Sequence, residues 1–283
     1  QRGRRTLCLP FLRWVHRFDR PGGTQYPNQW EDRVRNYLVG WDELGLELDE
    51  ILDHFSVEVG AELTERVASR FHAAKRSPFW YFDAIYCINR DDATARWAQM
   101  QARFERLGLA DRVRRFSAVE TPESHHVGCA LSHRRIVELA NDQRLDNVLV
   151  FEDDAVFLEG TPWCLGQSLA ELAELDWDAL YLGGCQWGKR ARRADGCEHL
   201  TIPETLTCTH AVAYHHTLYD QILTDVPARE PEVAVWCGRH AGIDQYLNRL
   251  LKDRRRYLTE PVLATQPGIL GREDPRYRDA FTV

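Results

Sequence analysis

The spacing of apolar residues changes along this chain of 283 residues, and the change divides the chain into two parts. In residues 46–71, apolar side chains recur three and four positions apart, which is typical of an amphipathic helix, and residues 30–38 look similar. A basic segment ending at Pro78 interrupts this periodicity. We therefore predict a helical N-terminal extension, residues 1–76, and a main domain, residues 77–283. The extension either packs against the main domain or binds a partner or acceptor.

Beyond Pro78, short apolar runs alternate with longer amphipathic segments. This alternation predicts an α/β domain in which parallel strands carry helices on both faces. The predicted strands are residues 82–89, 113–118, 147–151 and 178–182, and the predicted helices are residues 93–107, 132–141, 167–175 and 245–252. Sheets of this kind bind ligands beyond the carboxyl ends of their strands, so we expect functional residues there.

Composition and charge narrow the class of protein. Hydrophobic residues make up 44% of the chain, enough for one large core. A net charge of −7 argues against nucleic acid as a partner, because a basic face would be needed. Apolar runs stay shorter than the roughly 18 residues of a membrane span, so we expect no transmembrane segment. The scattered cysteines add the expectation of a reduced protein in the cytoplasm.

The eight cysteines are scattered and form no Cys-x-x-Cys pair. Several stand in apolar surroundings, which indicates buried, reduced thiols, although their even number leaves disulfides open. A zinc site built from Cys185, Cys197, His199 and Cys208 is the less favoured alternative, because their spacing is irregular.

Three consecutive acids, Glu152, Asp153 and Asp154, follow the most apolar predicted strand. Three buried carboxylates would be costly, so they are either solvated at the strand end or neutralised by a cation. In an extended segment Glu152 and Asp154 share one face while Asp153 points to the other. Two carboxylates on one face are the minimal protein contribution to a Mg²⁺ or Mn²⁺ site, which phosphate oxygens and water would complete.

Several motifs around the acidic run occur in a fixed order. They are Tyr86-Cys87-Ile88-Asn89-Arg90-Asp91, Val127-Gly128-Cys129-Ala130-Leu131-Ser132-His133, Val150-Phe151-Glu152-Asp153-Asp154, Tyr181-Leu182-Gly183-Gly184, Thr209-His210-Ala211-Val212-Ala213 and Gly242-Ile243-Asp244-Gln245-Tyr246. From about residue 80 to 270, this set resembles glycosyltransferase family 25, which includes lipopolysaccharide and collagen galactosyltransferases. The resemblance implies a GT-A-like, Rossmann-like domain that binds a nucleotide sugar.

The resemblance also implies roles for the donor-binding residues. Asn89 and Arg96 fall where the family's first strand and helix meet the nucleotide and its phosphates. Ser132 and His133 fall in a block that resembles part of the donor pocket, although Ser132 could instead cap the following helix and His133 could be a packed polar residue. Asp153 would orient the acidic run or contact the sugar.

For the metal, Asp154 is the first candidate ligand and Glu152 the second. Asp244 matches a late acid of the family and is our candidate general base, which would take the proton of the acceptor hydroxyl. As an alternative, Asp244 caps the helix that follows it. His210 would help bind donor or metal, or would be structural.

The sequence departs from the family pattern at two places. The segment from Ser124 to Val127 stands where the family usually has an acid, and Arg90 replaces a common leucine. Neither change touches the acidic run, but both would alter the choice of donor sugar. Residues 1–76 have no place in the resemblance.

These observations together predict a glycosyltransferase that moves a hexose, galactose or glucose first, from a UDP-sugar to an acceptor hydroxyl. The acceptor would be a glycan, a protein or another hydroxyl compound, and the metal Mn²⁺ or Mg²⁺. One alternative is a catalytically silent module that binds nucleotide sugar or glycan. A metal-dependent phosphohydrolase is disfavoured, because no nucleophile or second metal cluster stands near the acidic run.

Overall fold

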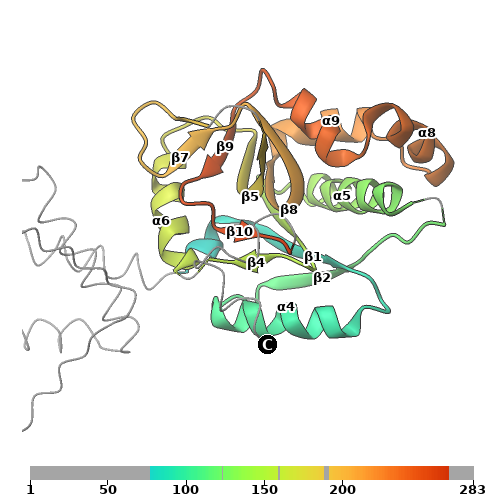
Figure 1. The fold of residues 1–283 in the computed structure, drawn as a ribbon, viewed down its shortest axis with the longest axis horizontal. Coiled ribbons are helices and arrows are strands. Elements are labelled where there is room, and N and C mark those ends of the chain that lie inside the picture. Colours follow the sequence, from blue (N-terminus) through green and yellow to red (C-terminus); the bar gives the residue numbers. More distant parts are fainter. Residues whose placement is uncertain (1–76, 123, 159, 188–190, 268–283) are drawn as a thin grey trace, which may run out of the picture. The chain divides into compact units, whose positions relative to one another are not determined.

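The computed structural model describes residues 77–267, apart from residues 123, 159 and 188–190. The predicted helical extension, residues 1–76, lies outside the described residues. Within the described part, the main element is a mixed sheet of eight strands in the order β2-β1-β3-β8-β5-β9-β7-β6 (Figure 1). Its strands are β1 (Ala84–Asn89), β2 (Val113–Ser117), β3 (Asn147–Glu152), β5 (Ala179–Trp187), β6 (Arg192–Arg193), β7 (Leu200–Ile202), β8 (Thr205–His215) and β9 (Arg256–Thr259).

Strand β8 corrects the expectation of an all-parallel sheet. β1 pairs in parallel with β2 and β3, and β5 pairs in parallel with β9, but β8 lies antiparallel between β3 and β5. A parallel neighbour needs a long crossover connection, usually a helix. The chain instead returns from β5 through the short strands β6 and β7, so β8 runs back against β5. Because two antiparallel steps restore the direction, β1, β3 and β5 still end at the same edge of the sheet.

Helices cover both faces of the sheet, as the alternating pattern predicts (Figure 1). The α-helices are α4 (Thr94–Arg106), α5 (His125–Asp142), α6 (Thr161–Leu172), α7 (Tyr219–Asp225), α8 (Glu230–His240) and α9 (Ile243–Leu250). Short 3₁₀ turns, η1 (Pro78–Tyr81) and η2 (His216–Leu218), and a two-stranded sheet of β4 (Val156–Phe157) with β10 (Ala264–Thr265) complete the described elements.

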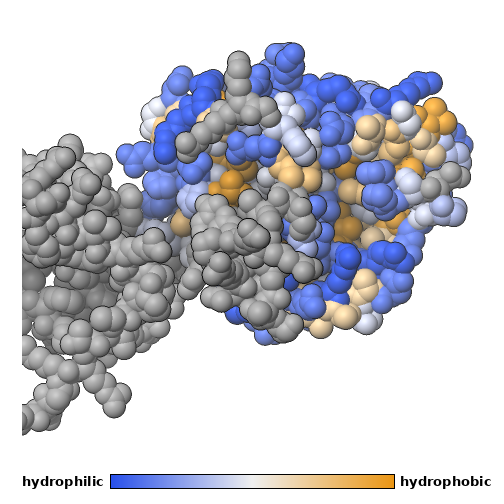
Figure 2. Space-filling model, viewed as in Figure 1, coloured by the Kyte–Doolittle hydropathy of each residue, from blue (hydrophilic) through white to orange (hydrophobic). Residues whose placement is uncertain are grey.

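Alternate residues of each central strand pack against different helices, so the core has two layers. On β3, Val148 and Val150 belong to the cluster that includes α5, α7, α8 and α9. Leu149 and Phe151 belong to the cluster that includes η1, α4 and α6. Figure 2 shows that the visible face of the described residues is mainly hydrophilic, with apolar residues gathered in smaller areas. The strands thus contribute apolar side chains to both layers, which explains the continuous apolar run of β3.

Helix α5 begins at His125, seven positions before the predicted start of 132. Ser132 therefore lies inside the helix, and the alternative that it caps the helix is wrong. The earlier start depends on Gly128, because a Cβ there would lie 2.2 Å from the carbonyl oxygen of Val119. Only glycine lets the helix approach the 118–121 segment so closely.

Strand β8 bulges next to the expected site. Its register against β5 shifts between Gly183 and Cys185, and Cys208 takes a left-handed conformation with φ of 71°. Bulges redirect side chains and are frequent beside active sites. The first residues of β8 thereby leave the regular ladder at the edge where β1 and β3 end.

Candidate functional site

The acidic run lies at the carboxyl end of β3, between β1 and β8, as the sequence predicts. Asn89 ends β1 and Glu152 ends β3, and these two strands pair in parallel up to this edge. Asp153 and Asp154 then form a turn. The alternation of strand side chains continues as far as Asp153, which turns away from Glu152 toward α4.

Asp153 joins the two residues that the resemblance assigns to the nucleotide. Its Oδ2 accepts a hydrogen bond of 2.8 Å from the amide of Asn89, and its Oδ1 pairs with Arg96 at 3.1 Å. Arg115 of β2 donates to the Asn89 amide oxygen over 2.8 Å, and also to the carboxylate of Asp91. Asp153 therefore orients Asn89 and Arg96, while the side chain of Arg96 stays 61% exposed and open to a ligand.

Glu152 points to the opposite side, toward α5 and β8. Its Oε1 accepts a hydrogen bond of 2.6 Å from the Thr209 hydroxyl and lies 3.5 Å from Nε2 of His133. Burial by itself would raise the pKa of Glu152, but His133 and Thr209 outweigh it and lower the pKa below its usual value. Tyr214 holds the other ring nitrogen of His133 at 2.9 Å. Glu152 is therefore a stable carboxylate anchored through one oxygen.

Within the described residues, one group has the spacing of metal ligands: Cys129, His133 and Glu152, whose ligand atoms lie within 4.8 Å of one another. This sulfur, nitrogen and oxygen set suits zinc-like metals better than Mn²⁺ or Mg²⁺. The alternative set suggested by sequence forms no ligand group among the described residues. Cys185 and Cys208 do contact each other, but His199 pairs with Glu171 at 2.8 Å instead. The seven described cysteines are all free thiols.

Asp154 is the acid with an unmet bonding need. Its Oδ1 is buried and makes no hydrogen bond to the described protein. Burial, followed by the charges of Glu152 and Asp153, raises its pKa to about 6. A hard cation would relieve both conditions, since carboxylate oxygen is the ligand that Mg²⁺ and Mn²⁺ prefer. The residues present therefore fit a divalent metal at Asp154, with Glu152, whose charge acts on Asp154, as the second candidate ligand.

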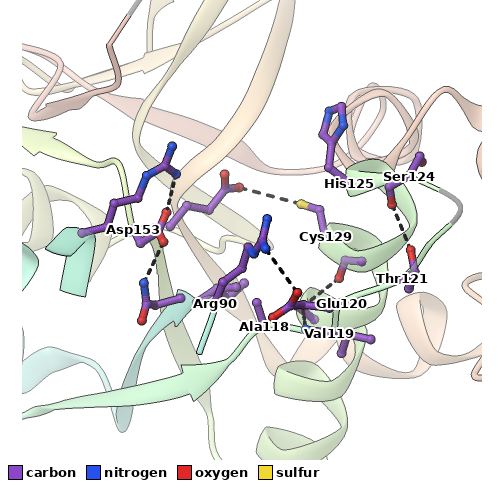
Figure 3. A pocket seen from close by; sticks show the side chains of 15 residues that line it. Arg90, Ala118, Val119, Glu120, Thr121, Ser124, His125, Cys129 and Asp153 are labelled. Carbon is purple, nitrogen blue, oxygen red and sulfur yellow. Dashed lines mark hydrogen bonds and ion pairs between the residues drawn. The ribbon is translucent and has the colours of Figure 1, made fainter. Parts of the chain in front are cut away.

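A cavity of about 250 Å³ opens beside the acidic run (Figure 3). It lies between the end of β1, the 118–121 segment and the first turns of α5. Asp153 stands on one side of the cavity, and His125 and Cys129 stand on the other (Figure 3). Arg90 and Glu120 lie in the middle and form an ion pair of 3.3 Å. Five of the predicted site residues line it: Asn89, Arg96, Ser132, Glu152 and Asp153. His133, Asp154 and Asp244 do not line this cavity.

Ser132 has a structural bond on each side. Its hydroxyl donates to the Gly128 carbonyl over 2.7 Å and accepts the backbone N–H of Val119 over 2.9 Å. It thus fixes the 118–121 segment against α5. His210 is fully buried, and its Nε2 lies 3.3 Å from the Ala264 carbonyl. Burial lowers the pKa of His210, so this residue of β8 is neutral where it contacts β10.

Asp244 lies in the first turn of α9, half-buried, and its carboxylate is engaged on both oxygens. Oδ1 accepts the N–H of Gln245 over 2.8 Å, and Oδ2 accepts the N–H of Cys208 over 3.2 Å. The first bond belongs to the beginning of α9, whose N-cap residue is Gly242. The second bond ties α9 to the bulge of β8 at its left-handed residue.

Sequence reasoning missed Arg115, Tyr214 and the partner role of Thr209. Arg115 is one of two consecutive arginines in β2, and alternation along the strand would have set it apart from Arg114. Thr209 stood inside a family motif, yet its bond to Glu152 depends on the antiparallel register of β3 and β8. Nothing in the sequence indicated that Tyr214 would support His133.

The structure shows a mixed α/β sheet with an acidic run at the carboxyl end of β3, and comparison with known proteins adds a family match. The family model of glycosyltransferase family 25, described as an LPS biosynthesis protein, matches residues 65–194. Over these residues the match confirms the resemblance to glycosyltransferase family 25, and the eight-stranded mixed sheet with its helices confirms the α/β class. No curated protein sequence matches the chain.

Two solved structures show a limited likeness. One is a glycosyltransferase involved in the glycosylation of the major capsid of PBCV-1, with 10% identity and a TM-score of 0.32, covering 50% of this chain and 63% of that one. The other is a mannose-1-phosphate geranyltransferase from Thermus thermophilus, with 13% identity and a TM-score of 0.33, covering 62% and 58%. The chain spans about three fifths of the length of these structures.

Proposed function

We propose that this chain is an active glycosyltransferase that moves a hexose, galactose or glucose first, from a UDP-sugar to an acceptor hydroxyl, with Mn²⁺ or Mg²⁺. The observation that carries the proposal is the unpaired, buried oxygen of Asp154 at the end of β3. The match of residues 65–194 to the family 25 model supports a nucleotide sugar as the ligand of this site. In the described residues no helix has the length and apolar character of a membrane span. A cytoplasmic location is part of the proposal, and the free thiols support it.

The residues divide the work of binding the donor. Asp154, with Glu152 beside it, would hold the metal, which neutralises charge that develops on the diphosphate leaving group. Arg96 would contact a phosphate through its exposed guanidinium, while Asp153 and Asn89 keep it in place. The cavity of about 250 Å³ is small for a whole nucleotide sugar, so it would take one part of the donor.

Asp244 stays our candidate base, with its orientation fixed by two backbone bonds. A carboxylate that accepts two N–H groups is held rigidly and still has lone pairs for an acceptor hydroxyl. In this role it would take the proton of the acceptor hydroxyl while that oxygen attacks the anomeric carbon.

The test is release of UDP from a panel of UDP-sugars with Mn²⁺ present, with and without added acceptors. We expect release from UDP-galactose or UDP-glucose, and loss of release when a chelator removes the metal. UDP binding without release from any sugar or acceptor would identify a silent binding module instead. Release of inorganic phosphate from simple phosphate esters would identify a phosphohydrolase.

A further inference from the structure

Three consecutive residues of β8 hold three different parts of the site. Thr209 donates to Glu152, the backbone N–H of Cys208 donates to Asp244, and the Thr207 hydroxyl accepts the indole N–H of Trp187 over 2.9 Å. Because Thr207 and Thr209 are two positions apart, their Cα atoms lie at most about 7 Å from each other. Along this bulge, a tryptophan, the candidate base and the acidic run are therefore bonded to three consecutive residues of one strand.

Trp187 ends β5 and is 60% exposed. Its polar atom is already satisfied by Thr207, so what it presents to solvent is apolar ring surface. Among the described residues no aromatic ring or cation is stacked on it. The other strongly exposed tryptophan, Trp80, differs in this respect, because the guanidinium of Arg112 lies 4.0 Å from its ring centre.

We propose that Trp187 is an acceptor-binding residue of this site, and that its open indole face stacks on the pyranose ring of a sugar acceptor. The inference rests on the proposed function and names the group that receives the transferred sugar. A pyranose presents a face of C–H groups that packs on an aromatic ring, while its hydroxyls stay at the rim. A sugar ring on Trp187 would then lie beside the part of β8 that also binds Asp244 and Glu152.

The order along β8 also explains why Trp187 is held by a hydrogen bond. A free indole would lose side-chain entropy on binding, whereas one fixed by Thr207 is preorganised. The residue that binds Asp244, the left-handed Cys208, directly follows the residue that binds Trp187. Trp187 contributes position and affinity for the acceptor and takes no part in proton transfer.

The experiment compares the parent chain with Trp187→Ala, Trp187→Phe and the control Trp80→Ala. Trp80 is 55% exposed and lies in η1, before the start of β1 and so at the opposite edge of the sheet. Each protein is first titrated with UDP and Mn²⁺. Binding of methyl β-galactoside, methyl β-glucoside and methyl β-N-acetylglucosaminide is then measured by saturation-transfer NMR with UDP and Mn²⁺ present.

We expect all four proteins to bind UDP equally. Trp187→Ala should weaken binding of the preferred glycoside roughly tenfold, or about 1.4 kcal/mol. Trp187→Phe keeps a ring but lacks the N–H, so it should stay within about threefold of the parent if stacking supplies the affinity. Trp80→Ala should match the parent.

Several results would overturn the inference while leaving the donor site standing. They are an unchanged glycoside affinity in Trp187→Ala, an equal loss in the Ala and Phe variants, or a parent that binds UDP but none of the three glycosides. Preference for a serine-containing peptide over every glycoside would also overturn it. A parent that fails to bind UDP with Mn²⁺ would refute the proposed function itself.

Discussion

At the scale of single residues, three adjacent acids have three different environments. Glu152 is held ionised by His133 and Thr209, and Asp153 is paired with Arg96 and Asn89. Asp154 alone keeps a buried oxygen without a partner. The same chemical group is therefore anchored in Glu152, paired in Asp153 and left with an unpaired oxygen in Asp154, according to its surroundings.

One substitution at Asp244 distinguishes a catalytic base from a purely structural residue. Asp244→Asn should lower kcat by about 100- to 10,000-fold if the carboxylate is the base. An amide can accept only one of the two backbone N–H groups well, so the free energy of unfolding should fall by roughly 1 to 3 kcal/mol. UDP affinity should be unchanged.

Steady-state kinetics with a working acceptor, UDP titration and urea unfolding measure the three effects separately. More than half of the parent kcat in the variant would remove the base role and leave Asp244 as the link between α9 and the β8 bulge. Loss of UDP affinity would make it a donor ligand instead.

The sequence predicted the site to the extent that it followed from strand periodicity and motif order. Asn89, Arg96, Ser132, Glu152 and Asp153 do line one cavity. The hydrogen bonds among them were not predictable, because each joins elements far apart in the chain. Asp153 lies 64 residues from Asn89, and their contact depends on how β1 and β3 pair.

At the scale of elements, strands were predicted better than the beginnings of helices. The four predicted strands match β1, β2, β3 and β5, because uninterrupted apolar runs leave few alternatives. The start of α5 was predicted late, since glycine and histidine disfavour a helix locally and only packing against the 118–121 segment compensates. The antiparallel direction of β8 depends on the connection before it and has no local signal.

Substitution of Gly128 tests the close approach of α5 to the 118–121 segment. We expect Gly128→Ala to lower the free energy of unfolding by about 1 to 3 kcal/mol, because the new methyl group would meet a backbone oxygen that cannot easily move. The displaced 118–121 segment lines the cavity, so UDP affinity should fall as well.

Gly238→Ala in α8 provides the matched control. A Cβ at Gly238 meets nothing within 4 Å, and alanine favours a helix over glycine by up to about 1 kcal/mol. Urea unfolding should therefore show opposite changes in the two variants. Equal free energies of unfolding for the parent and Gly128→Ala would mean that α5 leaves room for a Cβ beside the carbonyl oxygen of Val119.

At the scale of the whole molecule, the sheet brings distant segments to one edge and closes the opposite edge with ion pairs. Alternation of strands and helices was enough to predict the α/β class, because both layers of the core need apolar residues at regular intervals. At the opposite edge, Asp178 precedes β5 and binds Arg255 and Thr217. It is 2% exposed and joins the beginnings of β5 and β9 to the end of β8.

Asp178 makes the free energy of unfolding of the described domain depend on pH in the acidic range. Burial would raise its pKa, but the bonds from Arg255 and Thr217 outweigh it and lower the pKa from 3.8 to about 2. Because the folded pKa is the lower one, the contribution is complete above pH 4 and is lost as the pH falls through 2. We expect about 2 kcal/mol from this difference.

Urea unfolding of the parent and of Asp178→Asn across pH 2 to 7 checks this. The parent should be more stable by about 2 kcal/mol at pH 7, and the difference should shrink below pH 4. A difference that is constant across the whole range would show that the charge of Asp178 is not what stabilises this edge.

In the proposed function, Asp154 holds a divalent metal that binds the diphosphate of a UDP-sugar. The most direct measurement is calorimetric titration of UDP into the parent and into Asp154→Asn, each with and without Mn²⁺. In the parent we expect Mn²⁺ to strengthen UDP binding by at least about tenfold, or 1.4 kcal/mol. In Asp154→Asn the affinity should be weak and the same with and without the metal, while urea unfolding shows an intact fold. Equal dependence on Mn²⁺ in both proteins would contradict the account.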